Sequence, residues 1–95
     1  MTHAAAWFES HTAEAPVPLR ARMRELVAHD WSAEGLAVAA ERGLSAVVAH
    51  PGDRSVALDL LAADGLVTLA LLHQAEHRPE GLAGFAGRLL TGAVS

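Results

Sequence analysis

The longest apolar stretch of the sequence covers residues 55–77 and predicts one long helix. From Val56 to Leu72 its polar side chains are few and well separated: Asp59, Asp64 and Thr68. At about 100° per residue, the apolar side chains reach almost every direction around the helix axis. A helix that is apolar on two sides is either central in its fold or crosses a membrane. We therefore expect an all-α domain, a small bundle of about five helices organised around this helix.

The apolar positions of the long helix form two opposite walls. One wall consists of Val56, Leu60, Ala63, Val67 and Leu71, and the other of Leu58, Leu61, Gly65, Leu69 and Leu72. The strip left for water is marked by Asp59, Leu66, His73 and His77. This arrangement places Asp64 and Thr68 on the inner side, where an unpaired carboxylate is costly. We expect Arg42 or Arg54 to pair with Asp64.

Four shorter helices are predicted in the rest of the chain. They comprise a first helix that ends before Pro16, a second over 18–30, a third over 33–49 that is capped by Ser32, and a fifth that begins at Pro79. Gly43 lies inside the third helix, where glycine costs about 1 kcal/mol relative to alanine. A close helix crossing at Gly43 would compensate for that cost.

Composition limits the chain to one domain, residues 1–95, and narrows its function. Cysteine is absent, so neither disulfides nor thiolate metal sites stabilise the fold. All seven basic residues are Arg and alanine occurs 21 times, a bias typical of a GC-rich bacterial genome. The net charge of −4 argues against nucleic-acid binding, which needs surplus cations. The first fifteen residues contain no Lys or Arg and no apolar core of a signal peptide, so we expect a cytoplasmic protein.

A transmembrane role for the long helix is disfavoured by its two acids. Each Asp near the centre of a membrane-spanning helix costs about 2.5–3.5 kcal/mol, whereas each Leu contributes only about 0.5 kcal/mol. The apolar part is also shorter than the roughly 20 residues that spanning needs. We therefore predict no membrane span, although association with a membrane complex stays open.

The apolar content predicts a surface for another protein. Hydrophobic residues make up 52% of the sequence, more than so small a domain readily buries. Four short helices rich in Ala and Gly offer little area to cover both walls of the long helix. We expect a non-catalytic accessory subunit that docks onto a second copy or a larger bacterial complex, with a membrane-associated complex as one candidate host. The predicted interface residues are Val56, Leu60, Val67, Leu71, Phe85 and Leu89.

An alternative prediction is a divalent metal site at the end of the long helix. His73 and His77 share a helix face at i,i+4 spacing, and with Glu76 they offer ligands to zinc or another divalent transition metal. A third ligand would come from another segment, from His11, His29 or His50. The alternative without a metal is a solvated last helical turn, where the helix dipole stabilises protonated histidine.

The same five residues match H-x-x-E-H, the zinc-binding pattern of inverzincin peptidases. Such enzymes need a further ligand far downstream, and here only residues 78–95 follow. The sequence also offers few side chains for nucleophilic catalysis, because it contains no Cys, Lys or Tyr. We therefore expect that the protein is not an enzyme.

Overall fold

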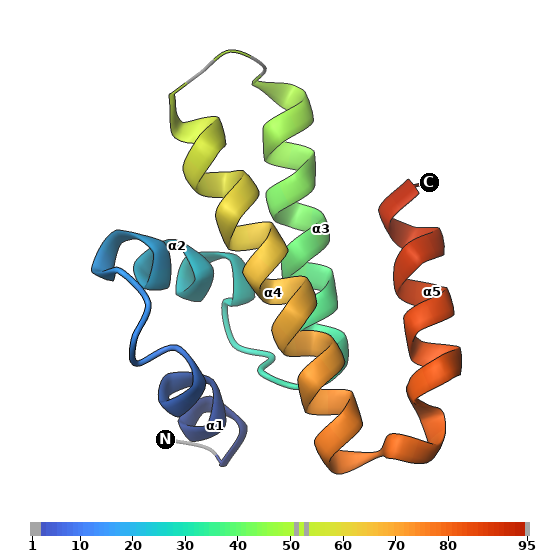
Figure 1. Ribbon diagram of the computed structural model, residues 1–95. Coiled ribbons are helices and arrows are strands. Elements are labelled where there is room, and N and C mark those ends of the chain that lie inside the picture. Colours follow the sequence, from blue (N-terminus) through green and yellow to red (C-terminus); the bar gives the residue numbers. More distant parts are fainter. Residues whose placement is uncertain (1–2, 51, 53, 95) are drawn as a thin grey trace.

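The computed structural model describes residues 3–50, 52 and 54–94, and its helices form the expected all-α bundle (Figure 1). The elements are α1 (His3–His11), α2 (Val17–Val27), α3 (Ala33–Ala49), α4 (Ser55–His77), a 3-10 turn η1 (Pro79–Gly81) and α5 (Leu82–Val94). The described residues contain no strand. The long helix has the predicted bounds and packs against the other elements.

Local sequence signals explain most helix ends. Pro16 and Pro18 start α2, where a missing N–H group is tolerated. Ser32 caps α3 by accepting a hydrogen bond from the Gly35 backbone N–H at 3.2 Å. The second helix ends earlier than predicted, because Ala28 adopts a left-handed backbone conformation with φ of 64°. At Pro79 the chain first forms η1, so α5 begins three residues later than the sequence predicted.

The closest helix contact joins α3 to α4 at Gly43, as the sequence predicted. A Cβ atom added to Gly43 would lie 3.0 Å from the Ala63 Cβ atom and 3.3 Å from Leu26 Cδ1. A side chain at this point would hold the two helices apart. The small residues therefore let α3 and α4 run against each other along most of their length (Figure 1).

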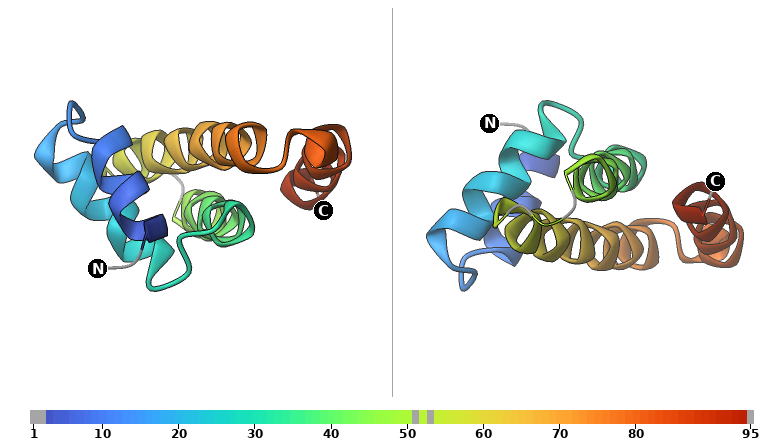
Figure 2. Two further views of the ribbon diagram at one scale, coloured as in Figure 1. Left: turned by 90° about the horizontal axis from the view of Figure 1, so that it is seen from below. Right: turned by 90° about the horizontal axis from the view of Figure 1, so that it is seen from above.

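The core lies where α2, α3 and α4 meet, and α1 and α5 each add side chains to it. It includes Phe8, Met23, Leu26, Val27, Leu36, Ala39, Ala40, Ala62, Leu66, Leu69, Ala70, Phe85 and Leu89. Figure 2 shows α3 lying along one side of α4, with α1 and α2 at one flank and α5 at the other. Among the described residues, no helix therefore lies over the remaining side of α4.

The predicted orientation of α4 is wrong. Leu66 and Asp59, which were expected to face water, are buried, whereas Asp64 and Thr68, which were expected to face inward, are exposed. A nearly uniform apolar sequence fixes no preferred side, so the tight contact at Gly43 and a partner for Asp59 decide which side turns inward. The exposed side of α4 therefore contains Asp64 and Thr68 together with Leu60, one of the predicted interface residues.

Candidate functional site

The uncovered side of α4 is the first candidate site, and we call it the outer face. Its members are Ala57, Leu60, Leu61, Asp64, Thr68, Leu71, Leu72 and Ala75. Leu60, Leu61 and Leu72 are 51%, 58% and 39% exposed, so three large apolar side chains of one helix meet solvent. Leu71 and Ala75 are half-buried at its C-terminal end, and Leu71 also packs against the core. Large apolar side chains grouped on one face are typical of an interaction surface.

The predicted interface residues divide between this surface and the core. Leu60 and Leu71 belong to the outer face, while Val56 and Val67 are half-buried beside it. Phe85 and Leu89 are buried, at 3% and 7% exposure, because α5 turns them toward α3. They line the floor of a cleft of about 220 Å³ between α3 and α5. These two residues therefore stabilise the fold and offer little surface to a partner.

The carboxylate that needs a partner is Asp59, not Asp64. Arg22 Nε donates a hydrogen bond to Asp59 Oδ1 at 2.5 Å, and this bond raises the pKa of the guanidinium. Arg22 also lies 3.0 Å from Glu25 on its own helix. The Asp59 side chain is only 11% exposed, so this ion pair anchors α2 to the inner side of α4.

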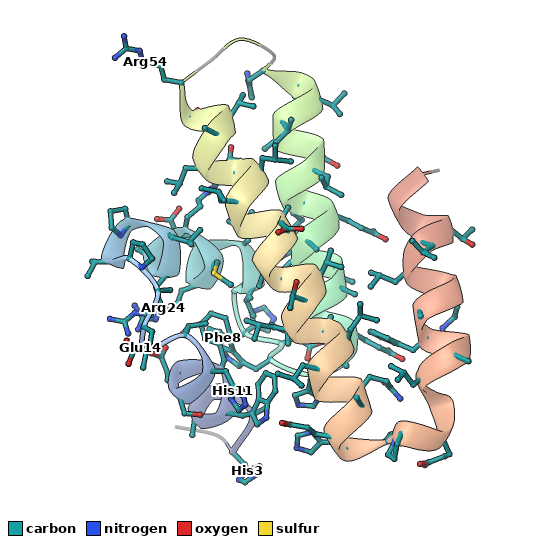
Figure 3. The ribbon with its side chains drawn as sticks, viewed as in Figure 1. His3, Phe8, His11, Glu14, Arg24 and Arg54 are labelled. Carbon is teal, nitrogen blue, oxygen red and sulfur yellow. The ribbon has the colours of Figure 1, made fainter. Side chains whose placement is uncertain are left out.

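The expected partners of Asp64 are engaged or distant. Arg42 donates a hydrogen bond to the Leu26 backbone oxygen at 3.0 Å and so provides a partner for a carbonyl group at the C-terminal end of α2. Arg54 points away from the bundle at the start of α4 (Figure 3). Asp64 itself is exposed in the middle of the outer face, where its carboxylate stays hydrated.

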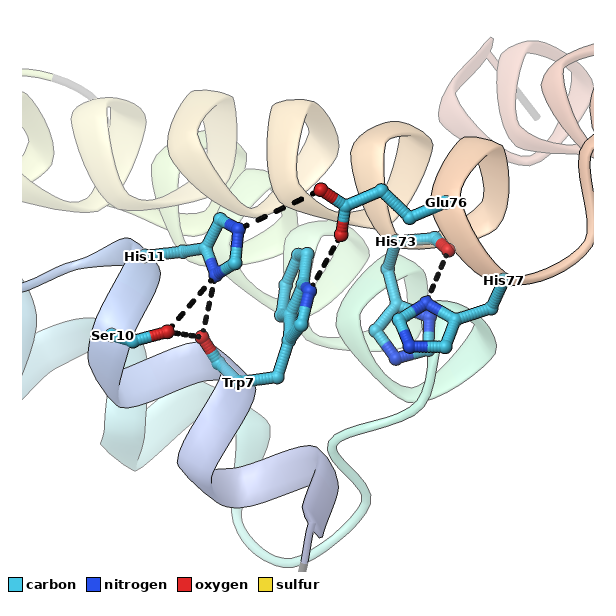
Figure 4. Close-up of polar contacts among 6 residues, drawn as sticks. All are labelled: Trp7, Ser10, His11, His73, Glu76 and His77. Carbon is cyan, nitrogen blue, oxygen red and sulfur yellow. Dashed lines mark hydrogen bonds and ion pairs between the residues drawn. The ribbon is translucent and has the colours of Figure 1, made fainter.

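The predicted histidine pair belongs to a second candidate site, a cluster that joins α1 to the end of α4 (Figure 4). Trp7 Nε1 donates a hydrogen bond to Glu76 Oε2 at 2.7 Å, and His11 Nε2 lies 3.8 Å from the other oxygen of that carboxylate. The Trp7 ring stacks on His11 at a centroid distance of 4.0 Å and meets His73 edge-on at 4.8 Å. The Glu76 carboxylate therefore contacts side chains of α1 and does not form a common site with His73 and His77.

The two histidines of α4 stack on each other. Their ring centroids lie 4.1 Å apart at an angle of 16°, and His77 Nδ1 lies 2.9 Å from the His73 backbone oxygen. A carbonyl only accepts, so His77 Nδ1 donates to it. Burial lowers the pKa of His73, and the nearby His77 acts in the same direction. The lowered pKa favours the neutral form of His73, which is the form that binds metal ions.

These histidines border a cleft of about 290 Å³ between the start of α3 and the end of α4, to which Ser32, Glu34, Gln74 and Arg78 also contribute. Among the described residues, however, no three His, Asp or Glu side chains are close enough together to hold a metal ion. His11 is near Trp7 and Glu76, and His29 and His50 are exposed at other positions. The structure thus brings the predicted pair together without a third ligand.

By length and composition alone, α4 also fulfils the requirements for a membrane span, and it is the one such helix in the part of the chain that the structure describes. A central helix of a water-soluble bundle meets the same test. A third of its most apolar window is buried in the bundle.

Comparisons with known proteins give this site no precedent: no protein-family model, no curated protein and no solved structure matches the chain. Leu61 and Leu72 were not among the predicted interface residues, because the sequence pattern places them on the wall opposite Leu60. The contact of Trp7 with Glu76 was not predicted either, because no local pattern signals it.

Proposed function

We propose that this chain is a non-catalytic helical interaction protein, which docks onto another polypeptide through the outer face of α4. The observation that carries the proposal is the exposure of Leu60, Leu61 and Leu72 on the longest helix. A second polypeptide over this face would give α4 the cover that it lacks on that side.

The energy available at this surface supports the proposal. Removing a leucine side chain from water contributes about 1.5–3 kcal/mol when burial is complete. Three partly exposed leucines therefore represent several kcal/mol that the isolated chain does not gain, before the costs of association. The absence of Lys, Cys and Tyr from the sequence leaves few nucleophiles and fits a subunit better than an enzyme. A cytoplasmic assembly, or one at a membrane surface, would be a suitable host.

The test compares the parent protein with a Leu60→Glu/Leu61→Glu variant. We expect the parent to self-associate in sedimentation experiments or to bind a hydrophobic dye, and the variant to lose this behaviour with its helical circular dichroism intact. Val17→Glu is the matched control, because Val17 is 70% exposed on α2, outside this face. A parent protein that is a stable monomer and binds no dye would overturn the proposal.

A second candidate function is divalent metal binding by His73 and His77, and the observation that favours it is the 4.1 Å stacking of their rings beside an open cleft. Water would complete the coordination of such a two-histidine site. Titration with Zn²⁺, Ni²⁺ or Cu²⁺ tests it by calorimetry and by the fluorescence of the adjacent Trp7. Binding that survives in both His73→Ala and His77→Ala, with His29→Ala as control, would exclude this site.

A further inference from the structure

The outer face of α4 reads almost the same in both directions along the helix. Its members pair about the level of Leu66, which lies midway between the two residues of every pair. The pairs are Ala57 with Ala75, Leu60 with Leu72, Leu61 with Leu71, and Asp64 with Thr68. Three pairs join identical residues, and the fourth joins a carboxylate to a hydroxyl.

This reversed order suits a two-fold interface, because it would place like residues opposite each other. When two copies of one helix pack antiparallel about a two-fold axis, the residue numbers of facing positions add to a constant. With the axis at the level of Leu66, leucines would face leucines and alanines would face alanines. Asp64 of one copy would accept a hydrogen bond from the hydroxyl of Thr68 in the other copy.

We infer that the polypeptide docked on the outer face is a second copy of this chain, with the two α4 helices packed antiparallel about an axis at the level of Leu66. This inference rests on the proposed function, because it names the partner for the same face. The face is accessible for such pairing, since Figure 2 shows α3 on one side of α4 and α1, α2 and α5 at its flanks.

Charge distinguishes the antiparallel pairing from a parallel one. In a parallel two-fold pair, Asp64 would face its own counterpart in a surface that excludes water, and like charges there are costly. In the antiparallel pair the two Asp64 residues are offset by four residues, about 6 Å along the axis. Thr68 Oγ1 now donates to the Asp64 backbone oxygen at 3.1 Å, so a small side-chain rotation would redirect it to the partner.

Cysteine cross-linking tests the inferred register, because the natural sequence contains no cysteine. Asp64→Cys and Thr68→Cys would be prepared separately, one of them labelled with ¹⁵N, then mixed and oxidised gently. Disulfides form when Cα atoms lie within about 7 Å, so we expect the mixed 64–68 dimer to exceed both self-linked dimers. Dominant self-linked dimers would show parallel pairing, and either that result or no mixed dimer would overturn the inference.

Substitutions at Thr68 test the same register by sedimentation without a cross-link. Thr68→Arg would place a cation opposite Asp64 twice in each dimer and tighten association about three- to tenfold, whereas Thr68→Glu would weaken it at least as much. Thr91→Glu is the matched control, because Thr91 on α5 is also exposed and also donates to the oxygen four residues earlier. Equal effects of Thr68→Arg and Thr68→Glu would contradict the antiparallel pair.

The outcomes separate this inference from the proposed function. If the parent protein is monomeric but binds a hydrophobic dye that Leu60→Glu/Leu61→Glu abolishes, the face docks onto a different polypeptide. The second copy is then excluded, while the interaction function stands. If the parent protein neither dimerises nor binds dye, both proposals fail.

Discussion

The two sides of α4 differ in how closely the other helices approach them. The inner side buries the small residues Ala62, Ala63 and Ala70 together with Leu66, whereas the outer face presents large leucines to solvent. Small side chains suit the inner side because α3 approaches so closely at Gly43. Burial on this helix therefore follows the space between helices, and Leu60, Leu61 and Leu72 remain available to a partner.

The strongest test of this comparison is one truncation made on each side. Leu66→Ala removes a fully buried side chain, and we expect it to lower the free energy of unfolding by about 2–5 kcal/mol. Leu61→Ala on the outer face should change it by about 0.5 kcal/mol or less in dilute solution, where the chain is alone. Denaturant unfolding measures both values. Equal effects would contradict the assignment of inner and outer sides.

The two acids of α4 provide the next test. Asp59→Ala leaves Arg22 without its buried partner, and we expect a loss of about 2 kcal/mol, less than for a fully buried pair because Arg22 keeps Glu25. Asp64→Ala on the outer face should be nearly neutral. Thermal unfolding of the two variants checks the difference. A greater loss for Asp64→Ala would restore the orientation expected from the sequence.

Two glycines differ in the space that surrounds them, and their substitutions should have smaller effects. Gly87→Ala on α5 adds a methyl group to open space, so its helix propensity should stabilise the protein by about 0.5–1 kcal/mol. Gly43→Ala should give no such gain, because its methyl group would press on Ala63 at 3.0 Å. Melting temperatures of the two variants measure this contrast, and an equal rise in both would show that α3 and α4 are not closely packed at Gly43.

The smallest expected effect concerns pH at the end of the same helix. Because the pKa of His73 is lowered from its ordinary value of 6.5, the unfolded chain binds the proton more readily than the folded protein. The contribution of His73 is therefore present above pH 6.5 and is lost as the pH falls through its folded pKa. Unfolding measured with a chelator above and below that pH should show a shallower slope for His73→Gln than for the parent protein. An unchanged slope would contradict the burial of His73.

The helices themselves could be predicted because their limits are local. Prolines, the Ser32 cap and the length of the apolar run at 55–77 all act within a few residues, and the structure has elements close to the predicted ones. The close crossing at Gly43 followed from the cost of a glycine inside a helix. No distant part of the chain was needed for these predictions.

The orientation of α4 could not be predicted in the same way. Apolar residues surround the helix, so periodicity gave no preferred inner side, and the decision came from Arg22 and Gly43 on other helices. The histidine pair was placed correctly on one face by its i,i+4 spacing. Its surroundings depend on Trp7, which is 69 positions away from Glu76 and therefore outside any local pattern.

The contact between Trp7 and Glu76 also implies an order of assembly. It joins residues that are 69 positions apart, and so long a loop must close before its contacts stabilise the fold. The helix α1 should therefore join a bundle that has already formed from α2, α3 and α4, and it should detach from that bundle first. In native-state hydrogen exchange, the amides of α1 would then exchange ahead of those in the middle of α3 and α4.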